Sequence, residues 1–197
     1  MDFASNEILK RNYASFGRDR VSEQPLKSTL KGKKFTLLVS EGTDLLLKGG
    51  FGDLGKNSKE LILGPVEALY LLSEKRIMVV EDEKNHELTF TDIIQHFRKD
   101  DAVIWTRYLI YRDLRSRGYV VRDGFGFGVD FRLYERGKYG EQVAKYMVFG
   151  MCEGVPIPIK RLNEILRFVQ STKKELILAV VDRRGEIVYY SLSPLVF

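Results

Sequence analysis

The chain has 197 residues, of which 44% are hydrophobic, and it carries a net charge of +5 with a pI of about 9.2. Its one cysteine, Cys152, excludes an internal disulfide and fits a reducing compartment. The sequence has neither a run approaching the length of a membrane helix nor the apolar N-terminal segment of a signal peptide, so we expect a cytoplasmic protein without a membrane span.

The positive charge is concentrated in one half of the chain. Residues 101–197 contain 16 Lys and Arg against 11 Asp and Glu, whereas residues 1–100 contain 16 of each. A basic half favours a polyanionic partner, because neutralising phosphates releases counterions. Mildly basic domains with ordinary solvated charges are common, so charge alone does not identify a nucleic-acid-binding protein.

The N-terminal half is predicted to be a polar arm at residues 1–30 followed by a small α+β domain at residues 31–81. Within that domain, residues 33–39 are typical of a strand, and residues 77–80 of a second, shorter one. Pro65 opens a helix between them, at the first helical position that proline favours.

Residues 82–100 are rich in charge and are predicted to connect the two halves, with a helix near residues 90–97. A longer helix is expected at residues 104–117, where apolar side chains recur at i, i+4 and i+7. Gly118 follows at the position of a C-terminal cap.

The C-terminal domain, residues 101–197, is predicted to be a mixed sheet packed by helices, which makes the fold class α+β or mixed α/β. Residues 127–134 alternate apolar and polar side chains, as in a half-buried strand, and this places Tyr134 on the polar face at the strand end. The continuous apolar run 176–181 is typical of a strand covered on both faces. The other predicted elements are a strand at 145–149, a loop at 150–158, a helix at 159–169, a turn at 182–185 and a last strand at 186–192.

Motifs of common cofactor sites are missing from the sequence. The glycines of Gly124–Gly128 precede a strand pattern rather than a helix, so they indicate a turn and not a dinucleotide site. No P-loop, HExxH or CxxC occurs, and one cysteine with two histidines argues against structural zinc. We therefore expect neither a cofactor nor a metal.

Two long stretches resemble the archaeal tRNA-splicing (tRNA-intron) endonuclease family. They are YRDLRSRGYVVRDGFGFGVDFRLYERG (residues 111–137) and LRFVQSTKKELILAVVDRRGEIVYY (residues 166–190), and the segments LLLKGGFGDL and GPVEALYLL match the family's N-terminal domain more loosely. The resemblance implies cleavage of precursor tRNA at bulge-helix-bulge junctions, with 2′,3′-cyclic phosphate and 5′-hydroxyl products. It also implies a C-terminal domain of the catalytic type.

The family cleaves RNA with a tyrosine base, a histidine acid and a lysine that stabilises the phosphate charge. The resemblance assigns Tyr134 and Lys174 to the first and last of these roles, but Val143 occupies the histidine position. The only histidines, His86 and His96, lie far upstream. Valine cannot transfer a proton, and losing a general acid lowers the rate by roughly 10²–10⁴.

The resemblance also implies RNA contacts. Arg167 precedes Lys174 by seven residues, about two helical turns, and matches an arginine that clamps a bulged base, which its planar guanidinium suits. Lys173 and Arg132 are further RNA-binding candidates. Without the family, Tyr134 would be a solvated strand-end tyrosine, and both Lys174 and Arg167 ordinary polar residues of a helix.

Some members of the family are heterotetramers of two catalytic and two structural subunits, and the missing histidine fits a structural subunit. The last strand and the C-terminal tail are expected to pair with a partner subunit through Val188, Tyr190, Leu195 and Phe197, although the tail has the alternative of folding back on its own core. Glu153 is the one acidic residue in the loop expected to reach another subunit.

Three functions therefore stay open. The first is a structural, RNA-positioning subunit that works with a catalytic chain in a heterotetramer. The second is an active homo-oligomeric endonuclease in which Lys138, Tyr139 or Glu141 supplies the acid. The third is an RNA-binding protein outside splicing.

Overall fold

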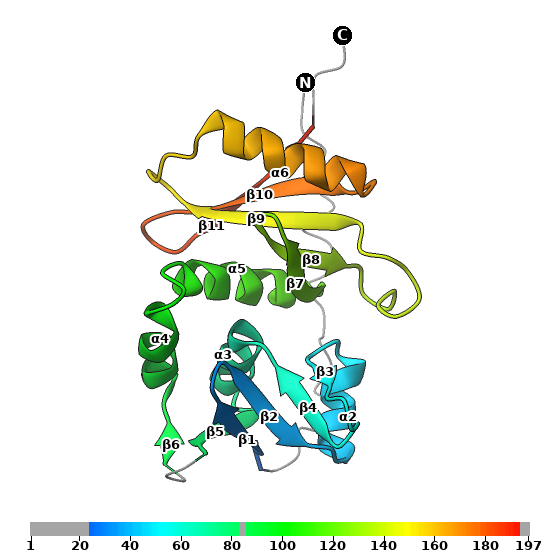
Figure 1. Cartoon of the computed structure of the whole chain (residues 1–197), viewed down its shortest axis with the longest axis vertical. Coiled ribbons are helices and arrows are strands. Elements are labelled where there is room, and N and C mark those ends of the chain that lie inside the picture. The colour runs from blue at the N-terminus through cyan, green and yellow to red at the C-terminus, as the bar shows by residue number, and fades with distance from the viewer. Residues whose placement is uncertain (1–23, 83–85, 194–197) are drawn as a thin grey trace.

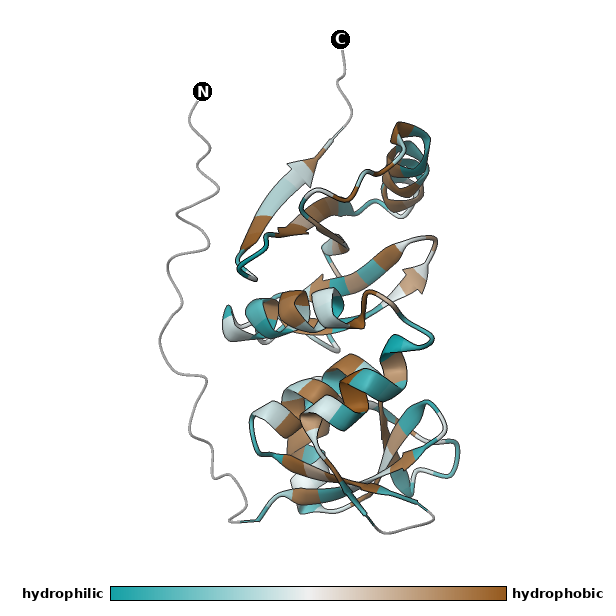
Figure 2. Ribbon diagram, turned by 90° about the vertical axis from the view of Figure 1, so that its left-hand side faces the viewer, coloured by the Kyte–Doolittle hydropathy of each residue, from teal (hydrophilic) through white to brown (hydrophobic). Residues whose placement is uncertain are grey.

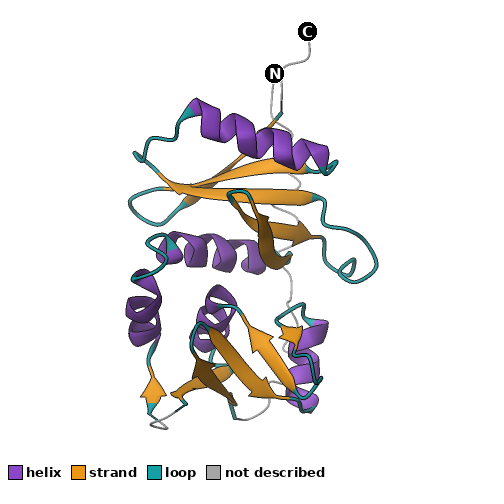
Figure 3. Cartoon of the chain, viewed as in Figure 1, coloured by secondary structure: helices purple, strands orange, loops and turns teal. Residues whose placement is uncertain are grey.

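The computed structural model describes residues 24–82 and 86–193, which form two sheet-based units stacked along the long axis of the molecule (Figure 1). The predictions for most of the polar arm and for Leu195 and Phe197 lie outside the described residues. Both units mix helices and strands (Figure 3), which confirms the predicted fold class.

The N-terminal unit is a six-stranded mixed sheet in the order β3-β4-β2-β1-β5-β6. Its strands are β1 (Leu26–Lys31), β2 (Lys34–Leu38), β3 (Asp53–Leu54), β4 (Glu60–Leu63), β5 (Ile77–Glu81) and β6 (Glu87–Leu88). Its helices are α2 (Glu41–Lys48), α3 (Pro65–Ser73) and α4 (Phe90–Arg98). Strands β1 and β5 run parallel, and the other neighbours are antiparallel.

The sheet begins earlier and the unit ends later than the sequence predicted. Residues 26–30, placed in the polar arm, belong to β1 and pair with β2 and β5. In the predicted connecting segment 82–100, β6 pairs with β5, and α4 packs on α3 and α5. The local reason is the capping box of Thr89 and Asp92, which starts α4 as a compact element.

The C-terminal unit is a five-stranded sheet in the order β11-β10-β9-β8-β7. Its elements are α5 (Ile104–Ser116), β7 (Val120–Gly126), β8 (Val129–Tyr134), β9 (Tyr146–Cys152), α6 (Ile159–Ser171), β10 (Glu175–Val181) and β11 (Ile187–Leu192). Strands β9 and β10 are parallel and are joined by the crossover helix α6, while the other pairs are antiparallel. The apolar run predicted as a covered strand is β10, which has α5 on one face and α6 on the other (Figure 1).

Helix α5 joins the two units, because it packs on α3 below and on β7, β9 and β10 above. One continuous apolar core therefore runs from the N-terminal sheet through α3 and α5 to the lower face of the C-terminal sheet, and Figure 2 shows apolar residues along the strands of both units. A smaller core, centred on Met147, Ile165 and Leu176, lies under α6 on the upper face.

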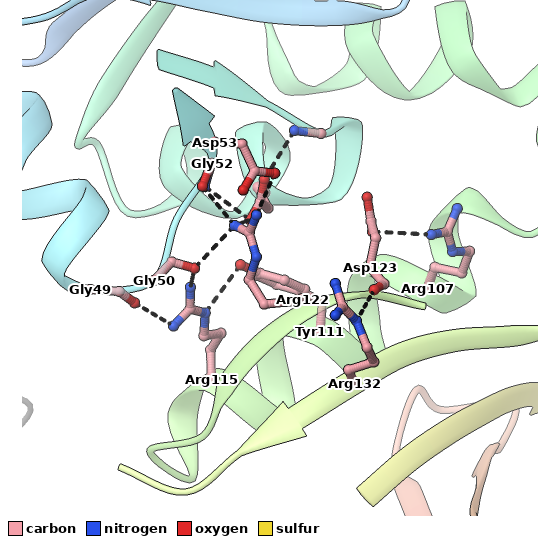
Figure 4. A network of polar contacts seen from close by, with 12 residues as sticks. Gly49, Gly50, Gly52, Asp53, Arg107, Tyr111, Arg115, Arg122, Asp123 and Arg132 are labelled. Carbon is pink, nitrogen blue, oxygen red and sulfur yellow. Dashed lines mark hydrogen bonds and ion pairs between the residues drawn. The ribbon is translucent and has the colours of Figure 1, made fainter. Parts of the chain in front are cut away.

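Two buried arginines of the C-terminal unit bind the N-terminal unit (Figure 4). Arg115 donates to the carbonyl oxygens of Gly49 and Gly50 at 2.9 and 3.1 Å. Arg122 donates to the Gly52 carbonyl and to Oε1 of Glu67, both at 2.9 Å. Burial raises the pKa of the Glu67 carboxyl, and the Arg122 charge and two backbone N–H donors offset part of that rise.

Candidate functional site

A pocket of about 500 Å³ opens beside the β7–β8 hairpin, next to the segments that precede β9 and β10. Its wall contains Tyr134, Val143 and Lys174, so three positions spread over residues 134–174 lie around one cavity. The remaining lining residues are Phe125, Arg132, Tyr139, Gly140, Glu141, Gln142 and Ala144.

Tyr134 is the last residue of β8 and reaches the pocket because the strand alternates as predicted. Val129, Phe131 and Leu133 are buried, whereas Tyr134 on the other face is only half-buried. Arg132, two residues earlier on the same face, donates to the Tyr134 hydroxyl at 3.4 Å, the long end of hydrogen-bond distances.

Lys174 is brought to the pocket by the end of α6. The helix closes with a Schellman motif, in which the Lys173 N–H donates to the Gln170 carbonyl at 2.8 Å and the Lys174 N–H to the Val169 carbonyl at 3.3 Å. Lys173 occupies the left-handed position with φ of 56°, where glycine is usual. The turn directs the chain into β10 with the half-buried Lys174 at its start.

Val143 stands at the rim of the pocket and is 82% exposed. The next residue, Ala144, is buried at 3% exposure and fixes this segment against the sheet. An apolar side chain this exposed contributes little packing energy, so the fold does not restrict which residue type occupies position 143. The site has no imidazole, because His96 is the last histidine in the sequence and belongs to α4.

Two other side chains with transferable protons lie in the same wall. Tyr139 packs edge-on against Tyr134 with ring centroids 5.1 Å apart, and Glu141 also lines the pocket. Lys138, the third candidate for a substitute acid, pairs instead with Glu135, and this hydrogen bond lowers the pKa of the Glu135 carboxyl.

The other predicted site residues lie elsewhere. Among the described residues, Arg167 and Lys173 are exposed and do not line this pocket. Glu153 is exposed directly after β9, which extends to Cys152 and so shortens the loop predicted at 150–158. Val188 and Tyr190 are each 51% exposed on β11, the edge strand of the sheet.

Phe125 also lines the pocket, although the sequence did not mark it as a site residue. It is 56% exposed, and its one signal was the Gly-Phe-Gly-Phe-Gly run, which predicts only a turn. That turn does form, with positive φ at Gly126, Phe127 and Gly128.

The cavity therefore combines a phenol, a primary amine and a guanidinium, a set suited to binding an anion and accepting a proton. It lacks the imidazole that would return a proton to a leaving group. Within residues 24–82 and 86–193, no three His, Cys, Asp or Glu side chains gather in a way that could bind a metal ion. None of the helices in these ranges is both long and apolar enough to span a bilayer.

Comparison with known proteins identifies relatives of both units. Residues 104–189 match the model of the tRNA intron endonuclease catalytic C-terminal domain, and residues 26–94 match the model of the tRNA intron endonuclease N-terminal domain. A tRNA-splicing endonuclease of Methanococcus vannielii is 35% identical over 173 residues, which cover 88% of this chain and 96% of the relative. A tRNA-splicing endonuclease of Pyrococcus furiosus is 33% identical over 76% of this chain and 84% of the relative, and one of Thermococcus onnurineus is 30% identical over 87% and 97%.

Proposed function

This chain belongs to the tRNA intron endonuclease family, and on that premise we propose that it is the structural, RNA-positioning subunit of an archaeal tRNA-splicing endonuclease. It binds precursor tRNA at the bulge-helix-bulge intron junctions and supports cleavage by a partner chain. The complex yields 2′,3′-cyclic phosphate and 5′-hydroxyl ends.

The observation that carries the proposal is Val143 in the wall shared with Tyr134 and Lys174. Cleavage by 2′-oxygen attack needs a base for the 2′-hydroxyl, a cation beside the phosphate and an acid for the departing 5′-oxygen. Tyr134 and Lys174 match the family's base and cation, and the third position carries a side chain that cannot donate a proton. The site keeps the groups that bind RNA but lacks the general acid, so it is better suited to holding RNA than to cutting it.

The RNA-contacting residues under this proposal are Arg132 at the pocket, together with Arg167 and Lys173 at the exposed end of α6. Arg167 stacks on a bulged base, while Lys173 binds phosphate. These positive groups belong to the half of the chain that carries the whole net charge of +5.

A surface for the catalytic partner lies on the upper face of the C-terminal sheet. Tyr190 pairs with Leu178 and Val188 with Val180, so these four side chains share one face. Helix α6 packs over the other end of that face, near Leu176, and leaves Val188 and Tyr190 half exposed. An apolar sheet face next to an unpaired edge strand is suited to association with a second sheet, giving a heterotetramer of two structural and two catalytic chains.

One observation favours a second function, an active homo-oligomeric endonuclease. Tyr139 and Glu141 lie in the wall of the pocket with Tyr134, so a side chain with a transferable proton is present although the histidine is not. In this alternative Tyr139 or Glu141 protonates the leaving 5′-oxygen. The third function, RNA binding outside splicing, requires no catalytic partner.

Cleavage of a bulge-helix-bulge RNA without divalent metal separates these functions. The purified chain is tested alone and then mixed with a chain from the same genome that carries the full Tyr-His-Lys set. The proposal predicts no cleavage alone and cleavage in the mixture. Cleavage by this chain alone, lost in Tyr139→Phe or Glu141→Gln, would establish the second function; binding without any effect on the partner would establish the third.

A further inference from the structure

We propose that Phe125 is a stacking platform for a nucleobase of the bound RNA, next to the phosphate held between Tyr134 and Lys174. This inference rests on the proposed function and deepens it, since it gives the pocket a base-binding wall besides its phosphate-binding groups. The platform works whether or not the site can cut.

Phe125 is exposed although it lines a polar pocket. The side chain is 56% exposed while it lines the same cavity as Tyr134 and Lys174. A phenylalanine stabilises a fold mainly through burial, so an exposed phenylalanine beside charged groups contributes little to the stability of the protein. An aromatic ring beside positive side chains is the combination that binds unpaired nucleotides, because bases stack on the ring while cations hold the backbone.

The guanidinium of Arg132 lies 4.0 Å from the centroid of the Phe125 ring. Arg132 is itself fixed, because its Nε donates to the Asp123 carbonyl at 2.7 Å. The stacked pair restricts the ring before any ligand binds, which lowers the entropy lost on binding. Arg132 also contacts the Tyr134 hydroxyl, so the platform is linked to a group that faces the bound phosphate.

A bulge in β7 shapes the backbone that presents the Phe125 ring. The register of β7 against β8 shifts between Asp123 and Gly126, where β7 contains one residue more than β8. In an uninterrupted strand Phe125 would lie on the face opposite Arg122 and Arg132, because successive side chains alternate. The bulge instead turns it toward Arg132, and bulges near functional sites commonly redirect a side chain in this way.

Glycine at position 124 is required for this bulge. A Cβ there would lie 2.0 Å from the carbonyl oxygen of Val129, a distance that no side chain tolerates. The orientation of Phe125 therefore depends on the absence of a side chain at Gly124.

Phe127 provides a matched control two residues away. It is also exposed, at 70%, but its ring stacks on Phe168 with centroids 4.6 Å apart, and it does not line the described pocket. A general effect of removing a surface aromatic from this turn would be the same at both positions, whereas base stacking in the pocket depends on Phe125 alone.

The test uses the full chain and a bulge-helix-bulge RNA with a 2′-deoxy nucleotide at the cleaved position, which prevents attack on the phosphate. 2-Aminopurine replaces, in separate RNAs, each of the unpaired bases in the bulges. Fluorescence anisotropy gives the dissociation constant, and 2-aminopurine quenching reports stacking. We expect Phe125→Leu to weaken binding by about 5- to 100-fold and to remove the quenching of the bulge base that stacks on the ring. Phe125→Tyr and Phe127→Leu should bind like the wild type.

Equal binding and quenching by wild type and Phe125→Leu would overturn the inference while leaving the proposed function intact. Normal RNA binding with weaker association of Phe125→Leu with the catalytic chain would also overturn it, in favour of a protein contact at this ring. Failure of the wild-type chain to bind the RNA, alone and with the catalytic chain, would overturn both the inference and the proposed function. Circular dichroism of each variant separates a binding defect from unfolding.

Discussion

Replacing Arg122 with methionine tests how the two units are held together. Arg122 and Glu67 have side chains only 8% and 9% exposed, and Nη1 of the arginine lies 2.9 Å from Oε1 of the glutamate. Methionine keeps much of the volume but leaves the carboxylate buried without its cation, a change that typically destabilises by about 3–5 kcal/mol. The ion pair of Arg122 with Asp53 adds little, because the Asp53 side chain is 80% exposed.

The loss should depend on pH in a direction set by Glu67. Burial raises the pKa of this carboxyl above its ordinary value of 4.5, and Arg122 is the largest opposing influence. Without Arg122 the folded-state pKa rises further. A carboxyl whose pKa is higher in the folded state loses stability as pH rises from the unfolded pKa through the folded one. The deficit of Arg122→Met relative to wild type should therefore be smaller at pH 4.5 than at pH 7.

Urea unfolding followed by far-UV circular dichroism measures the free energy of unfolding at both pH values. The control is the pair Glu67→Gln and Arg122→Met in one chain, which removes the charge from both sides. This double variant should recover about 1–3 kcal/mol relative to Arg122→Met alone at pH 7, since no buried charge is left unpaired. Equal deficits at pH 4.5 and pH 7, or a double variant as unstable as Arg122→Met, would refute the reasoning.

Gly50→Ala should destabilise the protein by about 1–3 kcal/mol more than Gly32→Ala in thermal unfolding. Both residues have positive φ, but only a Cβ at Gly50 would collide with a valine of β7, at 2.3 Å. Equal losses of stability would show that the two units are not tightly packed at Gly50. Tyr189→Phe should cost about 1–2 kcal/mol, because its hydroxyl donates to the Asp113 carboxylate at 2.7 Å, and an unchanged free energy of unfolding would contradict that. Val188→Lys should weaken association with the catalytic chain, measured by analytical sedimentation, and should leave the circular dichroism spectrum unchanged. Normal assembly of this variant would show that the partner does not bind at Val188.

The sequence predicted most of the C-terminal unit because its signals are local. The alternation ending at Tyr134 and the helix at 104–117 were confirmed as β8 and α5, since period and burial agree there. The turn between β7 and β8 was also confirmed, but its consequence for Phe125 was not predicted, because a register shift depends on the partner strand and leaves no periodic pattern.

The boundary of the N-terminal unit was predicted wrongly for a similar reason. β1 (Leu26–Lys31) is short and has three polar residues in a row, 27–29, so it lacks the alternation of a strand. Its place in the sheet comes from pairing with β5, about fifty residues later in the chain. Likewise, the pocket depends on the Schellman turn at Lys173. This turn could not be predicted from the sequence, because its left-handed position holds lysine instead of the usual glycine. Arg115 and Arg122 bind backbone carbonyls of the other unit, and no sequence motif indicates such contacts.

The most direct test of the central claim is single-turnover cleavage by the complex of this chain with its catalytic partner, after Tyr134→Phe and Lys174→Ala are introduced into this chain only. If this chain positions RNA without cutting it, the rate of the chemical step at saturating enzyme should stay within about twofold of the wild-type complex, whereas the same changes in the partner should abolish cleavage. A loss of about 10²-fold or more from the substitutions in this chain would show that its own pocket performs the reaction, and would contradict the account.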